Sequence, residues 1–130
     1  MNPMTLQAHD LMPMFAVTNR CDGAIVHYQD VWQRKNLLLT SIPSADPATE
    51  QYVEALRARA GELGDDVQIV VTSEAVGGIP SPGVAIADRW GEIYFVRGAS
   101  RVADLPVVDE LVDWMHYIQT ECPECEGERR

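Results

Sequence analysis

Two cysteines near the C-terminus, Cys122 and Cys125, are the residues whose type and spacing most clearly allow chemistry. Two thiols separated by two residues can close a small disulfide, and such pairs can have lowered thiol pKa values. This pair follows the last expected helix, and glutamates surround it (Glu121, Glu124, Glu126 and Glu128). A helix C-terminus and nearby carboxylates both raise a thiol pKa, so we expect a reduced, silent pair, with thiol chemistry as the alternative.

The same pair would supply half of a tetrahedral zinc site. His116 precedes Cys122 by six residues and could add a ligand, as could Cys21, but the sequence has no second pair at this spacing. The nearby glutamates offer only harder oxygen donors. We therefore expect no tightly bound metal, and a site formed by Cys122, Cys125 and His116 is the alternative.

The third cysteine, Cys21, lies in an expected hairpin turn next to Arg20. The positive charge of Arg20 would favour the thiolate form of this cysteine. A single cysteine in a hairpin is nevertheless more often incidental than reactive.

Length and charge exclude several classes of function. The chain has 130 residues, enough for one ordinary domain, and its 10 basic and 20 acidic residues give a formal charge of −10. That charge opposes nucleic-acid phosphates and anionic lipid, so we expect neither as a partner.

No apolar run approaches the ~20 residues that span a bilayer. The N-terminus lacks the basic start of a signal peptide, and these features predict a cytoplasmic protein.

The first half of the sequence predicts a hairpin and a strand–helix–strand unit. Residues 15–28 form two short extended runs joined at Asp22-Gly23, a dipeptide typical of hairpin turns. Residues 36–42 are apolar on both faces, as in a central strand. Asp46 can cap a following helix that ends near Gly64, and residues 67–72 form the next strand. This order implies parallel pairing through a right-handed crossover.

The second half predicts a loop, a hairpin and a closing helix. Residues 73–82 read as a loop, followed by strands at 83–87 and 92–97. A helix over 106–120 places apolar residues on one side (Val107, Leu111, Trp114, Met115 and Ile118) and acids on the other (Asp109, Glu110 and Asp113). We divide the chain into an extension over 1–12, a domain over 13–120 and an acidic, cysteine-containing tail over 121–130.

This order of elements resembles the thioredoxin fold of the redoxins, the group of peroxiredoxins and bacterial thioredoxin-like reductases. The resemblance rests on the closing helix with its tryptophan and on two stretches, MFAVTNRCDGAIVHYQDVWQRKNLLLTSI and PSPGVAIADRWGEIYFV. It implies an α/β, thioredoxin-like fold with a central mixed sheet, an N-terminal hairpin, a β-α-β crossover, a C-terminal hairpin and a closing helix. It also implies that Pro82, after Ser81, is a cis-proline beside the groove where thioredoxins bind substrate backbone.

The active-site loop departs from the redoxin pattern. Redoxins keep an attacking cysteine near the N-terminus of the first helix, where the helix dipole stabilises a thiolate. Residues 41–49 of this chain contain no cysteine, and Asp46 and Thr49 stand where a reductase has its paired cysteines. A carboxylate caps a helix well but cannot attack a disulfide or a peroxide. The resemblance therefore implies a degenerate active site.

A second departure concerns the connection at residues 73–82, where redoxins usually have a helix. Without that helix, we expect one face of the sheet to be partly uncovered, which would favour a partner or a homodimer.

Two functions follow from these expectations. The first is a binding or regulatory role without a cofactor, in which a protein or peptide partner occupies the inherited groove at Asp46, Thr49, Ser81 and Pro82. Under this hypothesis the chain is not an enzyme. The alternative is a thiol-disulfide oxidoreductase or antioxidant protein in which Cys122 attacks and Cys125 resolves.

Overall fold

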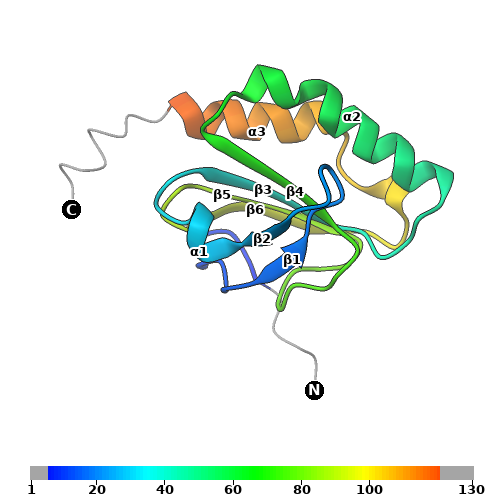
Figure 1. Ribbon diagram of the computed structural model, residues 1–130, viewed down its shortest axis with the longest axis horizontal. Coiled ribbons are helices and arrows are strands. Elements are labelled where there is room, and N and C mark those ends of the chain that lie inside the picture. The colour runs from blue at the N-terminus through cyan, green and yellow to red at the C-terminus, as the bar shows by residue number, and fades with distance from the viewer. Residues whose placement is uncertain (1–5, 121–130) are drawn as a thin grey trace.

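A central strand buried on both sides organises the computed structural model, which describes residues 6–120. All six residues of β3 (Asn36–Ser41) are buried. The sheet has the order β4-β3-β5-β6, with β4 at Val67–Thr72, β5 at Gly83–Ala87 and β6 at Ile93–Gly98 (Figure 1). β3 pairs in parallel with β4 and antiparallel with β5, which pairs antiparallel with β6. The predicted mixed sheet is confirmed.

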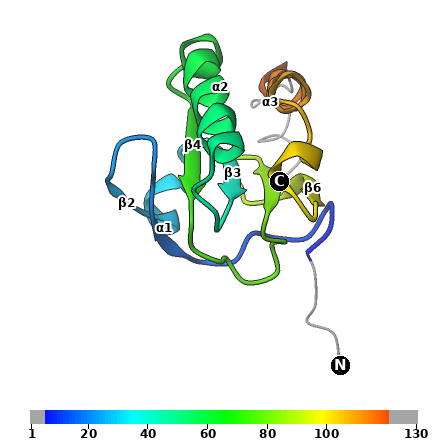
Figure 2. The same cartoon turned by 90° about the vertical axis from the view of Figure 1, so that its right-hand side faces the viewer.

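Two helices cover one face of this sheet. α2 (Pro47–Leu63) connects β3 to β4, begins after its N-cap Asp46 and ends at Gly64, whose φ is +85°. α3 (Val108–Thr120) lies beside α2 on the same face, preceded by the short 3₁₀ helix η1 (Val102–Asp104) (Figures 1 and 2). The core beneath them includes Leu38, Ile42, Val53, Leu56, Leu111 and Met115. The predicted crossover and closing helix are therefore confirmed.

The opposite face is covered by the hairpin, a short helix and two irregular segments. The hairpin strands are β1 (Ala16–Thr18) and β2 (Ile25–His27), and α1 (Tyr28–Val31) follows directly. Val76 and Ile79, from the connection between β4 and β5, join them in a second core with Leu37, Leu39, Val70 and Ala85. The expectation of a partly uncovered face is wrong, because loop side chains fill the space that a helix would take.

Residues 6–12 also belong to this covering layer. The amide of Leu6 donates to the Gly78 carbonyl over 2.8 Å, and the amide of His9 donates to the Ile93 carbonyl over 2.7 Å. The amide of Met12 donates to the Gly91 carbonyl over 2.8 Å. Residues 6–12 are thus bonded to the β4–β5 connection, to the first residue of β6 and to the turn before it.

The turn between β5 and β6 follows from two residues. One carboxylate oxygen of Asp88, which is 5% exposed, accepts from the amides of Trp90 at 2.9 Å and Glu92 at 3.0 Å. Gly91 has a φ of +86°, and a Cβ there would lie 3.0 Å from the hydroxyl of Tyr28. The turn therefore requires glycine both for its backbone conformation and for its close contact with α1.

Three details differ from the sequence prediction. The closing helix begins at Val108 instead of residue 106, so Val107 stays outside it and is 66% exposed. The hairpin strands are shorter than expected, since Tyr28 begins a helix. Trp114 is only half-buried, because its ring packs on Phe95 of the core on one side and lines a hollow at the surface on the other.

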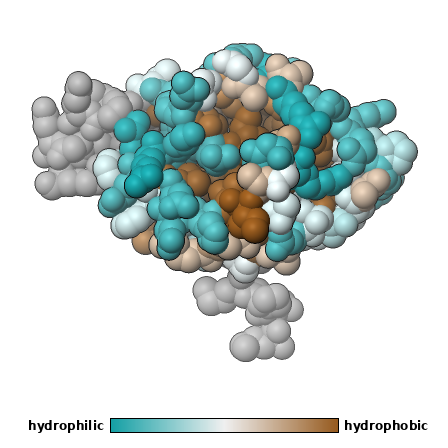
Figure 3. Space-filling view, in the orientation of Figure 1, coloured by the Kyte–Doolittle hydropathy of each residue, from teal (hydrophilic) through white to brown (hydrophobic). Residues whose placement is uncertain are grey.

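The surface is mainly hydrophilic on the face shown in Figure 3, with a patch of apolar residues near the β1–β2 hairpin. Ile25 in β2 is 64% exposed. Within residues 6–120, no helix combines the length and apolar character that crossing a membrane requires.

Two isoleucine truncations test whether the β4–β5 connection is part of the core. Ile79 is 7% exposed and Ile25 is 64% exposed. Replacing Ile79 with Ala should lower the free energy of unfolding by about 2–4 kcal/mol, because it leaves a cavity under the sheet. The same change at Ile25 should cost about 0.5 kcal/mol or less. Urea unfolding of both variants measures the difference, and equal losses would contradict the packing described here.

Candidate functional site

The carboxylate of Asp46 caps the N-terminus of α2. The Asp46 Oδ1 atom accepts from the Thr49 amide at 2.9 Å and from the Thr49 hydroxyl at 2.9 Å. Two hydrogen bonds hold the pKa of Asp46 below its usual value. The bond from the Thr49 amide has the larger effect, and the bond from the Thr49 hydroxyl has the second largest. Asp46 thus occupies the position at which a helix dipole favours negative charge.

Thr49 is fully buried and connects this cap to the preceding loop. Its hydroxyl lies 2.8 Å from the hydroxyl of Ser44. Because the Thr49 proton is donated to Asp46, the Ser44 hydroxyl is the donor in this contact. Ser44, Thr49 and Asp46 form a short chain of hydrogen bonds in which no side chain is a strong nucleophile.

The cis-proline loop lies against the end of β3. The Ser81–Pro82 peptide bond is cis, as the resemblance implies. The Ser81 and Ser41 hydroxyl oxygens are 3.0 Å apart, and the Ser41 hydroxyl donates to the Glu74 carbonyl over 2.8 Å. The Ser81 hydroxyl is therefore the donor to Ser41, which fixes the loop to the strand before α2.

A hollow of about 390 Å³ joins the two predicted parts of the site. It is lined by Asp46, Pro82 and seven further residues (Pro43, Ser44, Ala48, Ser100, Arg101, Val102 and Ala103). Two predicted residues, Asp46 and Pro82, therefore face one cavity, whereas Thr49 and Ser81 are outside its lining and hold its walls. The sequence does not predict the wall at residues 100–103, because it approaches Asp46 only after folding.

Arg20 lies close to this site, which the sequence did not predict. Its guanidinium forms an ion pair with Glu50 in the first turn of α2 and donates to the Ser44 carbonyl over 3.4 Å. The side chain is 22% exposed. The hairpin thus delivers a cation to the N-terminus of α2, where it stabilises the loop that carries Ser44.

Arg20 does not activate Cys21, which agrees with the expectation that this cysteine is incidental. Cys21 is half-buried against the core, and this burial raises its thiol pKa. Arg57 opposes the shift, and its guanidinium donates to the carbonyls of Cys21 at 3.1 Å and Arg20 at 2.9 Å. The thiol of Cys21 is therefore a packing group.

Metal and thiol-pair chemistry at the tail remain predictions. No group of three or more His, Cys, Asp or Glu residues that could hold a metal occurs within residues 6–120. His116 Nε2 lies 3.5 Å from a carboxylate oxygen of Glu62. Cys122 and Cys125 lie outside the described residues.

Solved structures with a similar fold include peroxiredoxins. The reduced 2-Cys peroxiredoxin of Plasmodium vivax aligns with a TM-score of 0.66 and 12% identity, covering 86% of this chain and 81% of that one. Mycobacterium tuberculosis AhpC gives 0.66 and 15%, with 92% and 98% covered. A peroxiredoxin-like protein of Aquifex aeolicus gives 0.62 and 15%, with 88% of each chain covered. No protein-family model and no curated protein matches this sequence.

These comparisons show that the chain has the thioredoxin-like fold of the redoxins. At 12–15% identity they show the fold alone and carry no active-site residue over to this chain. What the site does must be argued from its own residues.

The helix cap can be tested by its dependence on pH. Replacing Asp46 with Ala should lower the Tm at pH 7 by roughly 2–5 °C, because the Thr49 amide loses its acceptor. The pKa of Asp46 is lowered in the folded state. Its contribution is therefore complete above the ordinary carboxyl value of ~3.9 and is lost as the pH falls through the lowered pKa. Thermal unfolding of both proteins between pH 2 and 7 should show the difference shrinking in acid.

Asp65, an exposed residue in the turn after α2, provides the control. Replacing Asp65 with Ala changes the net charge equally but removes no cap. A pH-independent Tm difference between the wild type and the Asp46 variant would contradict the assigned role.

The packing role of Cys21 predicts a slow thiol. In a chain with Cys122 and Cys125 replaced by Ser, Cys21 should react with iodoacetamide with a midpoint above the ordinary thiol pKa of ~8.5. Burial disfavours the thiolate, and this raises the pKa. A midpoint below pH 8 would instead indicate an activated cysteine.

Proposed function

We propose that this redoxin-fold protein lacks thiol chemistry at the family position and binds an extended peptide segment of a partner protein in the hollow at the α2 N-terminus. The observation that carries the proposal is the occupation of the helix N-cap by Asp46, which accepts two hydrogen bonds from Thr49. The loop between β3 and α2 contains no cysteine. A capped carboxylate there supplies charge and hydrogen-bond acceptors but no attacking group.

The shape of the hollow supports a peptide as the occupant. Pro43, Ala48 and Pro82 give it apolar walls, and Asp46 and Arg101 place opposite charges at its rim. Arg101 also forms an ion pair with Asp104, with 3.1 Å between its Nε atom and a carboxylate oxygen. A cavity with mixed apolar walls and a few polar groups suits a short stretch of chain with one or two side chains.

Two α2 variants test this binding role. Ala48 lines the hollow, whereas Ala58 is exposed further along the same helix and is not among the lining residues. Nine-residue peptides selected from a random library on the intact chain serve as probes. Replacing Ala48 with Arg should weaken their binding at least 10-fold by filling the hollow, and replacing Ala58 with Arg should leave it unchanged. Peptides that bind both variants alike would place the binding site elsewhere.

Activity assays separate this proposal from the thiol-disulfide alternative. The whole chain should neither reduce insulin disulfides with dithiothreitol nor consume hydrogen peroxide faster than a variant with Cys122 and Cys125 replaced by Ser. An activity that this double variant loses would support the oxidoreductase or antioxidant function instead.

A further inference from the structure

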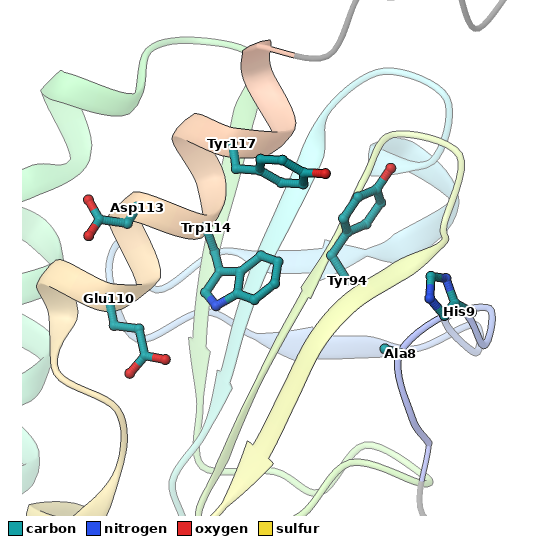
Figure 4. A pocket seen from close by; sticks show the side chains of 7 residues that line it. All are labelled: Ala8, His9, Tyr94, Glu110, Asp113, Trp114 and Tyr117. Atoms are coloured by element: carbon teal, nitrogen blue, oxygen red, sulfur yellow. The ribbon is translucent and has the colours of Figure 1, made fainter.

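A second, larger hollow lies between α3 and β6, and three aromatic side chains form its walls. Its volume is about 590 Å³, within the range of ligand sites. Tyr94 comes from β6, Trp114 and Tyr117 come from α3, and Ala8 and His9 close the far side (Figure 4). We call this hollow the aromatic groove. It shares no lining residue with the hollow at Asp46.

The rings of the aromatic groove are inclined to one another. Trp114 and Tyr117 have centroids 6.0 Å apart at 90°, and Tyr94 and Tyr117 have centroids 6.3 Å apart at 62°. Phe95 supports Trp114 from the core side, with centroids 5.4 Å apart. Tyr117 is 55% exposed although it is large and aromatic. The arrangement presents aromatic surface to solvent on a rigid helix and strand.

The charges of the aromatic groove have one sign. Glu110 and Asp113 belong to its lining, which contains no lysine or arginine. Figure 4 shows the Glu110 carboxylate below the Trp114 ring, while the Asp113 carboxylate points away from the three rings. His9 is engaged with Glu92, with 2.9 Å between its Nδ1 atom and the carboxylate. Aromatic faces next to a carboxylate attract cations.

We propose that the aromatic groove binds an arginine side chain from a basic, extended segment of another protein. A planar guanidinium stacks on tryptophan and tyrosine faces and also donates to a carboxylate, so it matches both features of the groove. A second copy of this chain is a poorer occupant, because two chains of charge −10 repel each other and would bring like charges together. The inference does not depend on the function proposed for the Asp46 hollow.

A pair of synthetic peptides tests the predicted chemistry. The first is an acetylated and amidated nine-residue peptide of alternating Arg and Ser, and the second has citrulline at each Arg position. Citrulline keeps the planar shape but removes the charge. At 0.15 M salt, the arginine peptide should shift the indole N–H signal of Trp114 and the amide signals of Tyr94 and Tyr117 in nitrogen–proton spectra. The citrulline peptide should bind at least 10-fold more weakly.

Variants at the rim show which features bind. Tyr117→Ala and Tyr117→Leu should each weaken binding of the arginine peptide by about 3- to 10-fold, because both remove the aromatic ring. Leu keeps the apolar volume, so a similar loss in both variants assigns the effect to the ring. Glu110→Gln should weaken it by a similar factor. Asp30→Asn is the matched control, because Asp30 is an exposed carboxylate on α1, across the sheet from α3, and the variant has the same net charge as Glu110→Gln.

Several results would overturn the proposal. Equal weakening of the arginine peptide by Glu110→Gln and Asp30→Asn, with no loss in the Tyr117 variants, would show a diffuse charge effect. Equal binding of the citrulline peptide would show that cation recognition is not involved. A dimer in analytical ultracentrifugation that Tyr117→Ala dissociates would identify a second copy as the occupant. Circular dichroism of each variant verifies that the fold is intact before affinities are compared.

Discussion

The burial of β3 on both faces is the constraint on which the rest of the structure depends. Leu37, Leu38 and Leu39 have no exposed surface, and alternate residues belong to opposite cores. A strand of this kind must have a layer on each side, because exposing a buried leucine on either face would cost about 1.5–3 kcal/mol. The two helices provide one layer. The hairpin, α1 and the β4–β5 connection provide the other.

The same strand fixes the candidate site. It ends at Ser41, whose hydroxyl accepts a hydrogen bond from the Ser81 hydroxyl and donates one to the Glu74 carbonyl, so both ends of the β4–β5 connection are bonded to one residue. Five residues later Asp46 begins α2. Because β3 and β5 are paired, the sheet brings the helix N-terminus and Pro82 to the same edge. Loop residues, including Pro43 and residues 100–103, complete the walls of the hollow between them.

The sequence predicted the elements that have a local signal and missed those formed by tertiary contact. The capping Asp46, the leucine-rich strand and Gly64 at the end of α2 each act on their own neighbours, so their roles can be predicted from residue type. The covering of the second face could not be predicted, because Val76 and Ile79 lie in a loop without periodicity. The position of Arg20 was also missed, since Glu50 lies 30 residues further along the chain.

The N-terminus of a helix can stabilise either a thiolate or a carboxylate. The unpaired amides of the first turn favour negative charge, whichever atom carries it. In this chain Asp46 accepts hydrogen bonds from both the amide and the hydroxyl of Thr49, which is fully buried. Neither of these two donors is therefore available to an incoming ligand. Electrostatic stabilisation at this point therefore contributes to the stability of α2. A ligand of the hollow must be held by its apolar walls and rim charges, which favours an occupant with side chains over a small anion.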